Sequence, residues 1–167
     1  MMDSNGCSKL KIKKGFDESQ LQWMRAEAQS IKSQFGDAPA FMCYHIPTDD
    51  FLDAYVVRGY QKEYDSKEEF SRFDLNQGVD FGKKCEAIKP IGQRILPLAK
   101  ECGVDGIFVG HCHIINTSVL HDGVRFTFGL KTGLYDYYDE TAIGGTLITL
   151  DDKKFSVCHI YYSADDI

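Results

Sequence analysis

Three histidines stand just beyond two short apolar runs, and imidazole is the side chain that most often binds metal ions in proteins. His45 follows the run at residues 39–44, and His111 and His113 follow the run at residues 104–109. Metal–imidazole bonds are about 2.0–2.1 Å long, and the paired metals of hydrolytic sites lie about 3.5–4 Å apart. The residue types therefore indicate a metal site, with His45, His111 and His113 as its predicted ligands.

The spacing of His111 and His113 predicts how these two side chains are presented. In an extended strand, residues two apart leave the same face, with Cα atoms about 6.5 Å apart. Gly110 has no Cβ, which lets backbone or ligand come close, and Cys112 would point away and pack in the interior. The alternative is a strand end with two surface histidines, and the second run, which ends at His45, favours a metal site over it.

Buried strands are predicted to position these histidines. Short apolar runs are typical of such strands, and the run at residues 38–46 has no polar alternation, as in a parallel strand covered on both faces. Ligands of open α/β sheets bind beyond the carboxyl ends of the strands. The strands at residues 38–46 and 104–109 would therefore bring the histidines to one edge. His121 and His159 fall in a turn and in another strand, and we interpret both as non-ligands.

Two helices are predicted to cover the sheet. Asp17 and Gln20 have the spacing of a capping box, and Gly36 is suited to end the first helix. Apolar residues at spacings of three and four mark its core-facing side: Leu21, Met24, Ala28, Ile31 and Phe35. A second helix within residues 91–102 either begins near Pro97 or is kinked there, because proline disrupts a helix interior.

The other segments are predicted from turn signals. An Asp-Gly dipeptide indicates a hairpin at residues 118–128, and a second hairpin is expected at residues 146–161. Residues 134–140 are aromatic and acidic and are expected to form a loop at the rim of the site. Residues 48–90 form a long insertion with little periodicity, which is either a lid over the site or a solvated surface segment.

Composition limits the class of protein. With 167 residues, 43% of them hydrophobic, the chain is sized for a single domain with its own core. A net charge of −6 argues against nucleic acid as a general partner. No apolar run reaches the roughly 18 residues of a membrane span, and no signal peptide is visible. The six cysteines form no Cys-x-x-Cys pair, which favours a reducing, cytoplasmic compartment.

The histidine motifs resemble those of the calcineurin-like metallophosphoesterases. Residues 41–47 (F-M-C-Y-H-I-P) resemble the single-histidine motif of that superfamily, and residues 110–113 (G-H-C-H) resemble its last metal motif. Residues 82–86 (G-K-K-C-E) and 131–133 (K-T-G) are similar to a bacterial and fungal branch related to the purple acid phosphatases. Three shorter matches to strands and a helix of that branch are Asp3-Ser4-Asn5, Gln20-Leu21-Gln22-Trp23 and residues 144–150.

The resemblance implies a fold, a reaction and a ligand set. The fold would be mixed α/β, a partial metallophosphoesterase αββα sandwich with one sheet, flanking helices and C-terminal hairpins. The reaction would be hydrolysis of phosphate esters with two divalent or trivalent metal ions (Mn, Fe or Zn). His45 and His111 would bind one metal and His113 the other. Because imidazole must be neutral to bind, metal binding should weaken below pH ~6.5.

The carboxylate-bearing motifs of this family are absent from the sequence: Asp-x-His, Gly-Asp-x-x-Asp and Gly-Asn-His-Asp or -Glu. The resemblance therefore covers only the C-terminal half of the family's catalytic domain, and we expect the chain alone to be inactive or nearly so. A separate N-terminal half, or a second copy of this chain, is the expected partner. The alternative is a non-catalytic metal-binding remnant. Four acidic residues are candidates to replace the missing ligands in part: Asp49, Asp50, Asp136 and Asp139.

Overall fold

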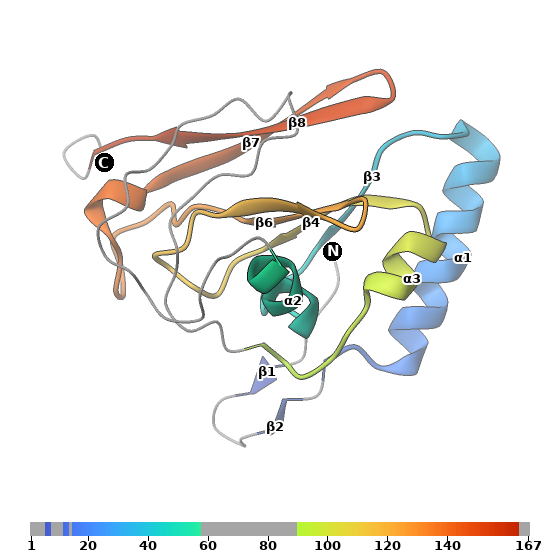
Figure 1. The fold of residues 1–167 in the computed structure, drawn as a ribbon, viewed down its shortest axis with the longest axis horizontal. Helices are drawn as coiled ribbons and strands as arrows, with labels where there is room; N and C mark the ends of the chain where they lie inside the picture. The colour runs from blue at the N-terminus through green and yellow to red at the C-terminus, as the bar shows by residue number, and fades with distance from the viewer. Residues whose placement is uncertain (1–5, 8–11, 14, 58–89, 164–167) are drawn as a thin grey trace.

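The chain folds into three layers, with a four-stranded mixed sheet between a layer of helices and a two-stranded hairpin (Figure 1). This is a mixed α/β fold, as predicted. The computed structural model describes residues 6–7, 12–13, 15–57 and 90–163. Most of the insertion predicted at residues 48–90 therefore lies outside the described residues.

The central sheet has the strand order β3-β4-β6-β5. Its strands are β3 (Ala40–Cys43), β4 (Val104–Val109), β5 (Ser118–His121) and β6 (Val124–Phe128). β3, β4 and β6 are parallel, so their carboxyl ends meet at one edge, whereas β5 pairs antiparallel with β6. The predicted turn joins β5 to β6 through Asp122 and Gly123, whose φ angles of 48° and 84° are those an Asp-Gly hairpin turn requires.

Helices cover one face of the sheet (Figure 1). They are α1 (Glu18–Phe35), α2 (Asp49–Val57) and α3 (Leu96–Glu101). The capping box of α1 forms as predicted, because Asp17 Oδ1 accepts from Gln20 N–H at 3.0 Å and Gln20 Oε1 accepts from Asp17 N–H at 3.1 Å. Gly36 ends α1 with φ 69°. Pro97 stands in the first turn of α3, which settles its role as a helix start rather than a kink.

The main core lies between these helices and the sheet. Phe51 of α2 is fully buried, and its ring meets those of Phe126 and Phe128 edge-on, at centroid distances of 5.0 and 5.2 Å. α2 therefore begins the stretch at residues 48–90 as a regular, core-packed helix. Met24 of α1 and Leu98 of α3 belong to the same core.

A C-terminal hairpin covers the other face of the sheet. It consists of β7 (Gly144–Asp151) and β8 (Lys154–Tyr161). Val157 and Phe155 of the hairpin pack on Phe108 and Phe41 of the sheet. Gly106 leaves room for these rings, because a Cβ there would lie 3.0–3.3 Å from three of them.

The N-terminal segment is described only in part. The strand match at residues 3–5 lies outside the described residues. Next to it, β1 (Gly6–Cys7) pairs antiparallel with β2 (Ile12–Lys13) in a two-stranded sheet separate from the central one.

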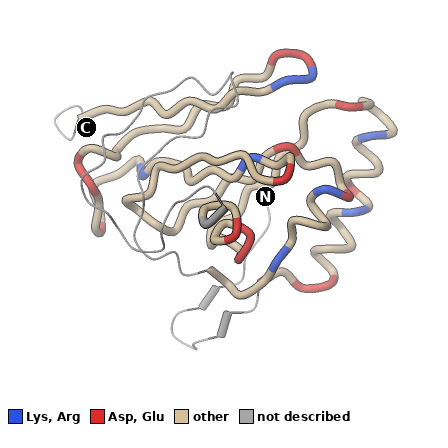
Figure 2. The backbone as a smooth tube through the Cα atoms, in the orientation of Figure 1, with Lys and Arg blue, Asp and Glu red and all other residues tan. Residues whose placement is uncertain are grey.

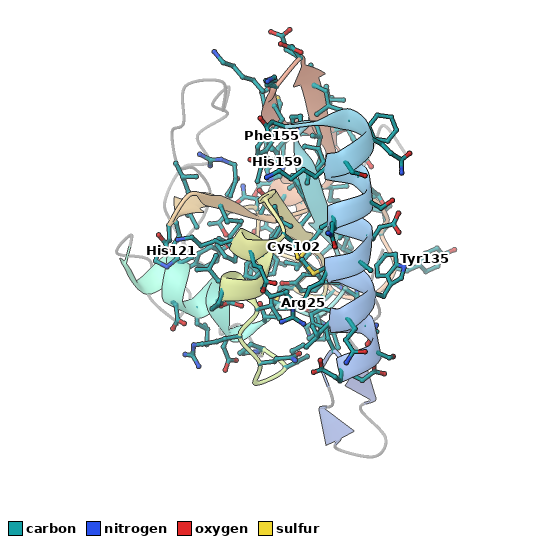
Figure 3. All side chains as sticks on the ribbon, turned by 90° about the vertical axis from the view of Figure 1, so that its right-hand side faces the viewer. Arg25, Cys102, His121, Tyr135, Phe155 and His159 are labelled. Atoms are coloured by element: carbon teal, nitrogen blue, oxygen red, sulfur yellow. The ribbon has the colours of Figure 1, made fainter. Side chains whose placement is uncertain are left out.

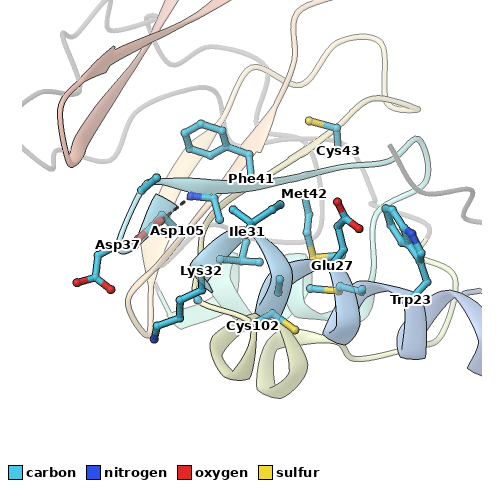
Figure 4. Close-up of a pocket in the computed structure, with 17 residues that line it drawn as sticks. Trp23, Glu27, Ile31, Lys32, Asp37, Phe41, Met42, Cys43, Cys102 and Asp105 are labelled. Atoms are coloured by element: carbon cyan, nitrogen blue, oxygen red, sulfur yellow. Dashed lines mark hydrogen bonds between the residues drawn. The ribbon is translucent and has the colours of Figure 1, made fainter. Parts of the chain in front are cut away.

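The apolar stripe of α1 is only partly in the core, and this corrects the prediction. Met24 is buried, whereas Ile31 is 40% and Phe35 is 70% exposed. Part of the stripe lines a cavity of about 370 Å³ between α1 and β3, with Trp23 and Ile31 on its wall (Figure 4). An 18-residue helix is about 27 Å long and a four-residue strand about 13 Å. α1 is therefore longer than β3, the edge strand beside it, and extends past its end.

Exposed ion pairs connect the helices to one another. Arg25 of α1 contacts Glu101 of α3 at 3.3 Å, and Arg94 before α3 contacts Asp53 of α2 at 2.8 Å. Residues of both signs are interspersed along α1 and α3 (Figure 2). Exposed pairs of this kind contribute at most about 1 kcal/mol each.

Candidate metal site

Backbone hydrogen bonds between neighbouring segments continue beyond the ends of β3 and β4. They fix the backbone from which the His45 side chain projects. Tyr44 N–H donates to the Phe108 carbonyl at 3.1 Å, and Gly110 N–H donates to the His45 carbonyl at 3.1 Å. The backbone of His45 is thereby held against Gly110. His45 and His111 leave neighbouring parallel strands at the same edge of the sheet.

The imidazoles of His45 and His111 lie against each other at this edge. Their ring centroids are 5.3 Å apart and their planes cross at 86°. Two imidazoles on one tetrahedral metal have centroids about 5 Å apart, because each metal–nitrogen bond is about 2.0–2.1 Å. Gly110 lies beside the His45 ring, since a Cβ there would stand 3.4 Å from His45 Nδ1, an ordinary contact distance. The spacing suits two ligands of a single ion.

The backbone at His111 differs from the extended strand that the sequence predicts. β4 ends at Val109, and the chain turns at once, with Cys112 N–H donating to the Gly110 carbonyl at 2.9 Å. His111 has φ 71°, a left-handed conformation that costs a non-glycine residue about 1–2 kcal/mol. The prediction that His111 and His113 leave one face of a strand is therefore wrong. Cys112 is buried in the main core.

His113 is held by the loop that carries Asp136 and Tyr137. Its Nδ1 lies 3.0 Å from the Tyr137 carbonyl oxygen. The two rings stack, with centroids 4.4 Å apart and planes 18° apart. Asp136 Oδ2 lies 3.6 Å from the same nitrogen. The sequence predicted a rim loop here, but no spacing signal linked Tyr137 to a site histidine.

This loop is anchored near both of its ends. Tyr162 Oη donates to the Thr132 carbonyl at 3.0 Å. At the other end, Asp139 caps the 3-10 turn Glu140–Ala142. Tyr135, in the same loop, projects away from the body of the molecule (Figure 3) and is 92% exposed. Tyr137 therefore stacks on His113, whereas Tyr135 in the same loop faces solvent.

Buried polar contacts fix the segment that follows His45. Asp50 is 3% exposed and accepts from Thr48 Oγ1 at 2.9 Å and from Ile95 N–H at 2.7 Å. Tyr44 Oη donates to Thr48 Oγ1 at 3.1 Å, and burial raises the pKa of Tyr44, which keeps this donor neutral. The chain on either side of His45 is thus held by the sheet and by this cluster.

Asp136 is the one candidate carboxylate that contacts a site histidine in the described part of the chain. Asp50 accepts from the N–H groups of Ile95 and Leu96, at the start of α3. Asp49 lies 3.5 Å from an arginine nitrogen, and Asp139 caps a turn. Three of the four candidates therefore support local structure.

Within residues 15–57 and 90–163, no three His, Cys, Asp or Glu side chains are grouped so as to hold a metal ion. These residues offer two adjacent imidazoles, His45 and His111, and a separately held His113. Catalytic zinc sites have three protein ligands. The pair fits part of such a site, and metal binding by the three histidines stays a prediction.

His159 lies on β8 of the hairpin and is buried, and it was predicted to be a non-ligand. Its Nε2 donates to the Asn116 carbonyl at 3.1 Å and its Nδ1 accepts from Thr146 Oγ1 at 3.1 Å. The same hydroxyl accepts from Leu130 N–H at 3.0 Å. Burial lowers the pKa of His159 to about 4. The ring therefore acts as a neutral connector between the hairpin and the sheet, a role that the sequence did not reveal.

Comparison with known proteins gives no match, so a functional assignment rests on the geometry of the chain itself. No family model matches this sequence, and neither the curated proteins nor the solved structures contain a match. Among the described helices, none is both long enough and apolar enough to cross a membrane.

Proposed function

We propose that this chain carries histidine ligands of a metal-dependent phosphoesterase and acts on phosphate esters when further ligands come from outside these 167 residues. The observation that carries the proposal is the His45–His111 pair, with centroids 5.3 Å apart at the ends of adjacent parallel strands. His45 and His111 would hold one ion, and His113 would serve a second through Nε2.

A bound Mn, Fe or Zn ion would supply Lewis acidity toward a phosphate ester and toward water. The chain's own contribution is to present neutral imidazoles from fixed backbone. The ladder bond to the His45 carbonyl and the Asp50 cluster restrict the His45 segment from both sides. Neutral imidazoles do not offset the charge of a metal ion, which is why carboxylates from outside are part of the proposal.

The test uses this chain mixed with a separately produced polypeptide that carries the three carboxylate-bearing motifs of the family. With manganese, the chain alone should hydrolyse p-nitrophenyl phosphate poorly, and the mixture should be active. His45→Ala and His111→Ala should abolish the activity of the mixture, while His121→Ala, outside the site, should not. An inactive mixture, turnover by the chain alone that survives His111→Ala, or a mixture insensitive to both substitutions, would contradict the proposal.

A non-catalytic metal-binding module is the second candidate. It is favoured by the lack of a third grouped ligand among the described residues. Such a module would bind zinc through His45 and His111 and would stay inactive in every mixture. The activity assay and a zinc titration together therefore separate the two candidates.

A further inference from the structure

We propose that Tyr137 and Asp136 are positioning residues for His113, which keep its proton on Nδ1 and present Nε2 as the open nitrogen. The role that Nε2 then plays, as a metal ligand, rests on the proposed function. The position of the proton and of the ring does not depend on it.

The position of the proton follows from the contact of Nδ1. This nitrogen lies 3.0 Å from the Tyr137 carbonyl oxygen, which can only accept a hydrogen bond. A bare Nδ1 would face that oxygen with two lone pairs opposed. The Asp136 carboxylate, 3.6 Å away, favours a proton on the same nitrogen. A neutral His113 therefore carries its lone pair on Nε2, the arrangement by which outer groups orient metal-binding histidines.

The plane of the ring follows from stacking. The Tyr137 ring lies 4.4 Å from the His113 ring at 18°, so rotation of the imidazole about its χ2 angle would break the contact. The His113 side chain is 25% exposed. Stacking thus restricts a side chain that would otherwise be partly free to rotate.

Asp136 brings the Tyr137 carbonyl to this place. It has φ 65°, the left-handed conformation that aspartate adopts more readily than most residues. Proline, whose φ is held near −65°, cannot take this conformation, whereas glycine can. The two substitutions therefore separate the effect of backbone shape from that of the carboxylate.

The experiment reads the tautomer of each histidine by long-range ¹H–¹⁵N correlation spectra of the metal-free chain labelled at histidine, at pH about 8, where imidazole is neutral. His113→Gln identifies the His113 signals. His159 is the internal control, because its contacts assign it the opposite tautomer, with the proton on Nε2. Unchanged His159 signals also show that each variant is folded.

We expect the Nδ1–H form of His113 in the wild type, in Tyr137→Phe and in Asp136→Gly. Asp136→Pro, which moves the Tyr137 carbonyl, should shift it toward a mixture with the Nε2–H form. Tyr137→Ala keeps this carbonyl but removes the stacked ring, so it should shift the tautomer in the same direction to a smaller extent. An Nε2–H wild type, or a tautomer unchanged in both Tyr137→Ala and Asp136→Pro, would overturn the proposal. Zinc affinity at His113 should fall about tenfold in Tyr137→Ala. If the tautomers behave as expected but zinc does not reach His113, the proposed function fails and the positioning role stands.

Discussion

At His111, the side chain and the backbone have opposing requirements. Its φ of 71° suits glycine, yet the position carries an imidazole that lies against His45. Strained backbone at a non-glycine residue persists where the surrounding structure holds it, and it is common at functional sites. We therefore interpret the strain as the condition for placing this ring beside His45.

This conflict makes a prediction about stability. His111→Gly should unfold with a free energy about 1 kcal/mol higher than that of His111→Ala, because glycine relieves the left-handed strain and alanine keeps it. Urea denaturation of the two variants measures the difference. Equal stabilities, or a more stable alanine variant, would show that the backbone at this position is not strained.

The sequence predicted that His45 and His111 lie together at one edge of the sheet, but it did not predict the surroundings of the three histidines. Apolar runs that end at histidine are a local signal. The contact of His113 with Tyr137 spans 24 residues, and it depends on where a loop returns in space. The burial of Cys112 was predicted, but the turn that begins directly after β4 was not, because the apolar run gave no signal of where the strand ends.

At the scale of elements, local signals predicted starts and ends well. The capping box of α1, the Asp-Gly turn and Pro97 in α3 all follow from contacts within a few residues. The exposed end of α1 could not be predicted in this way. A 3.6-residue period shows which side of a helix is apolar, but the length of the neighbouring strand decides how much of that side is covered.

The Asp50 cluster joins β3, α2 and α3, and it gives a prediction at this scale. Asp50→Ala should lower the free energy of unfolding by about 2–4 kcal/mol, because Thr48 Oγ1 and the buried Ile95 N–H lose their acceptor. Asp53→Ala, on the same helix, is the matched control. Its carboxylate makes an exposed pair with Arg94, so its loss should cost less than about 1 kcal/mol. Denaturant unfolding of both variants checks this, and equal losses would contradict it.

For the whole molecule, His159 connects the hairpin layer to the central sheet and should make stability depend on pH. Its pKa falls from 6.5 to about 4 on folding, so the unfolded chain binds the proton more readily. The contribution of this residue is complete above pH 6.5 and is lost as pH falls through about 4. The loss amounts to roughly 3 kcal/mol.

His159→Gln, which cannot titrate, isolates this contribution from that of the carboxylates. Between pH 7 and pH 4.5, the wild type should lose about 2–3 kcal/mol more stability than the variant. Denaturant unfolding at the two pH values measures the difference. If the free energies of unfolding of the two proteins fell equally between these pH values, protonation of His159 would not contribute to the loss of stability.

Zinc binding to the purified chain tests the central claim, that His45 and His111 share one ion, most directly. Calorimetry near pH 7.5 would compare the wild type with His45→Ala, His111→Ala and the double variant, with His121→Ala as control. Each single substitution should lower the affinity at least about tenfold, and the double variant should lose less than the sum of the two effects, because both ligands hold the same ion. Wild-type affinity in either single variant, or two fully additive losses, would contradict the account.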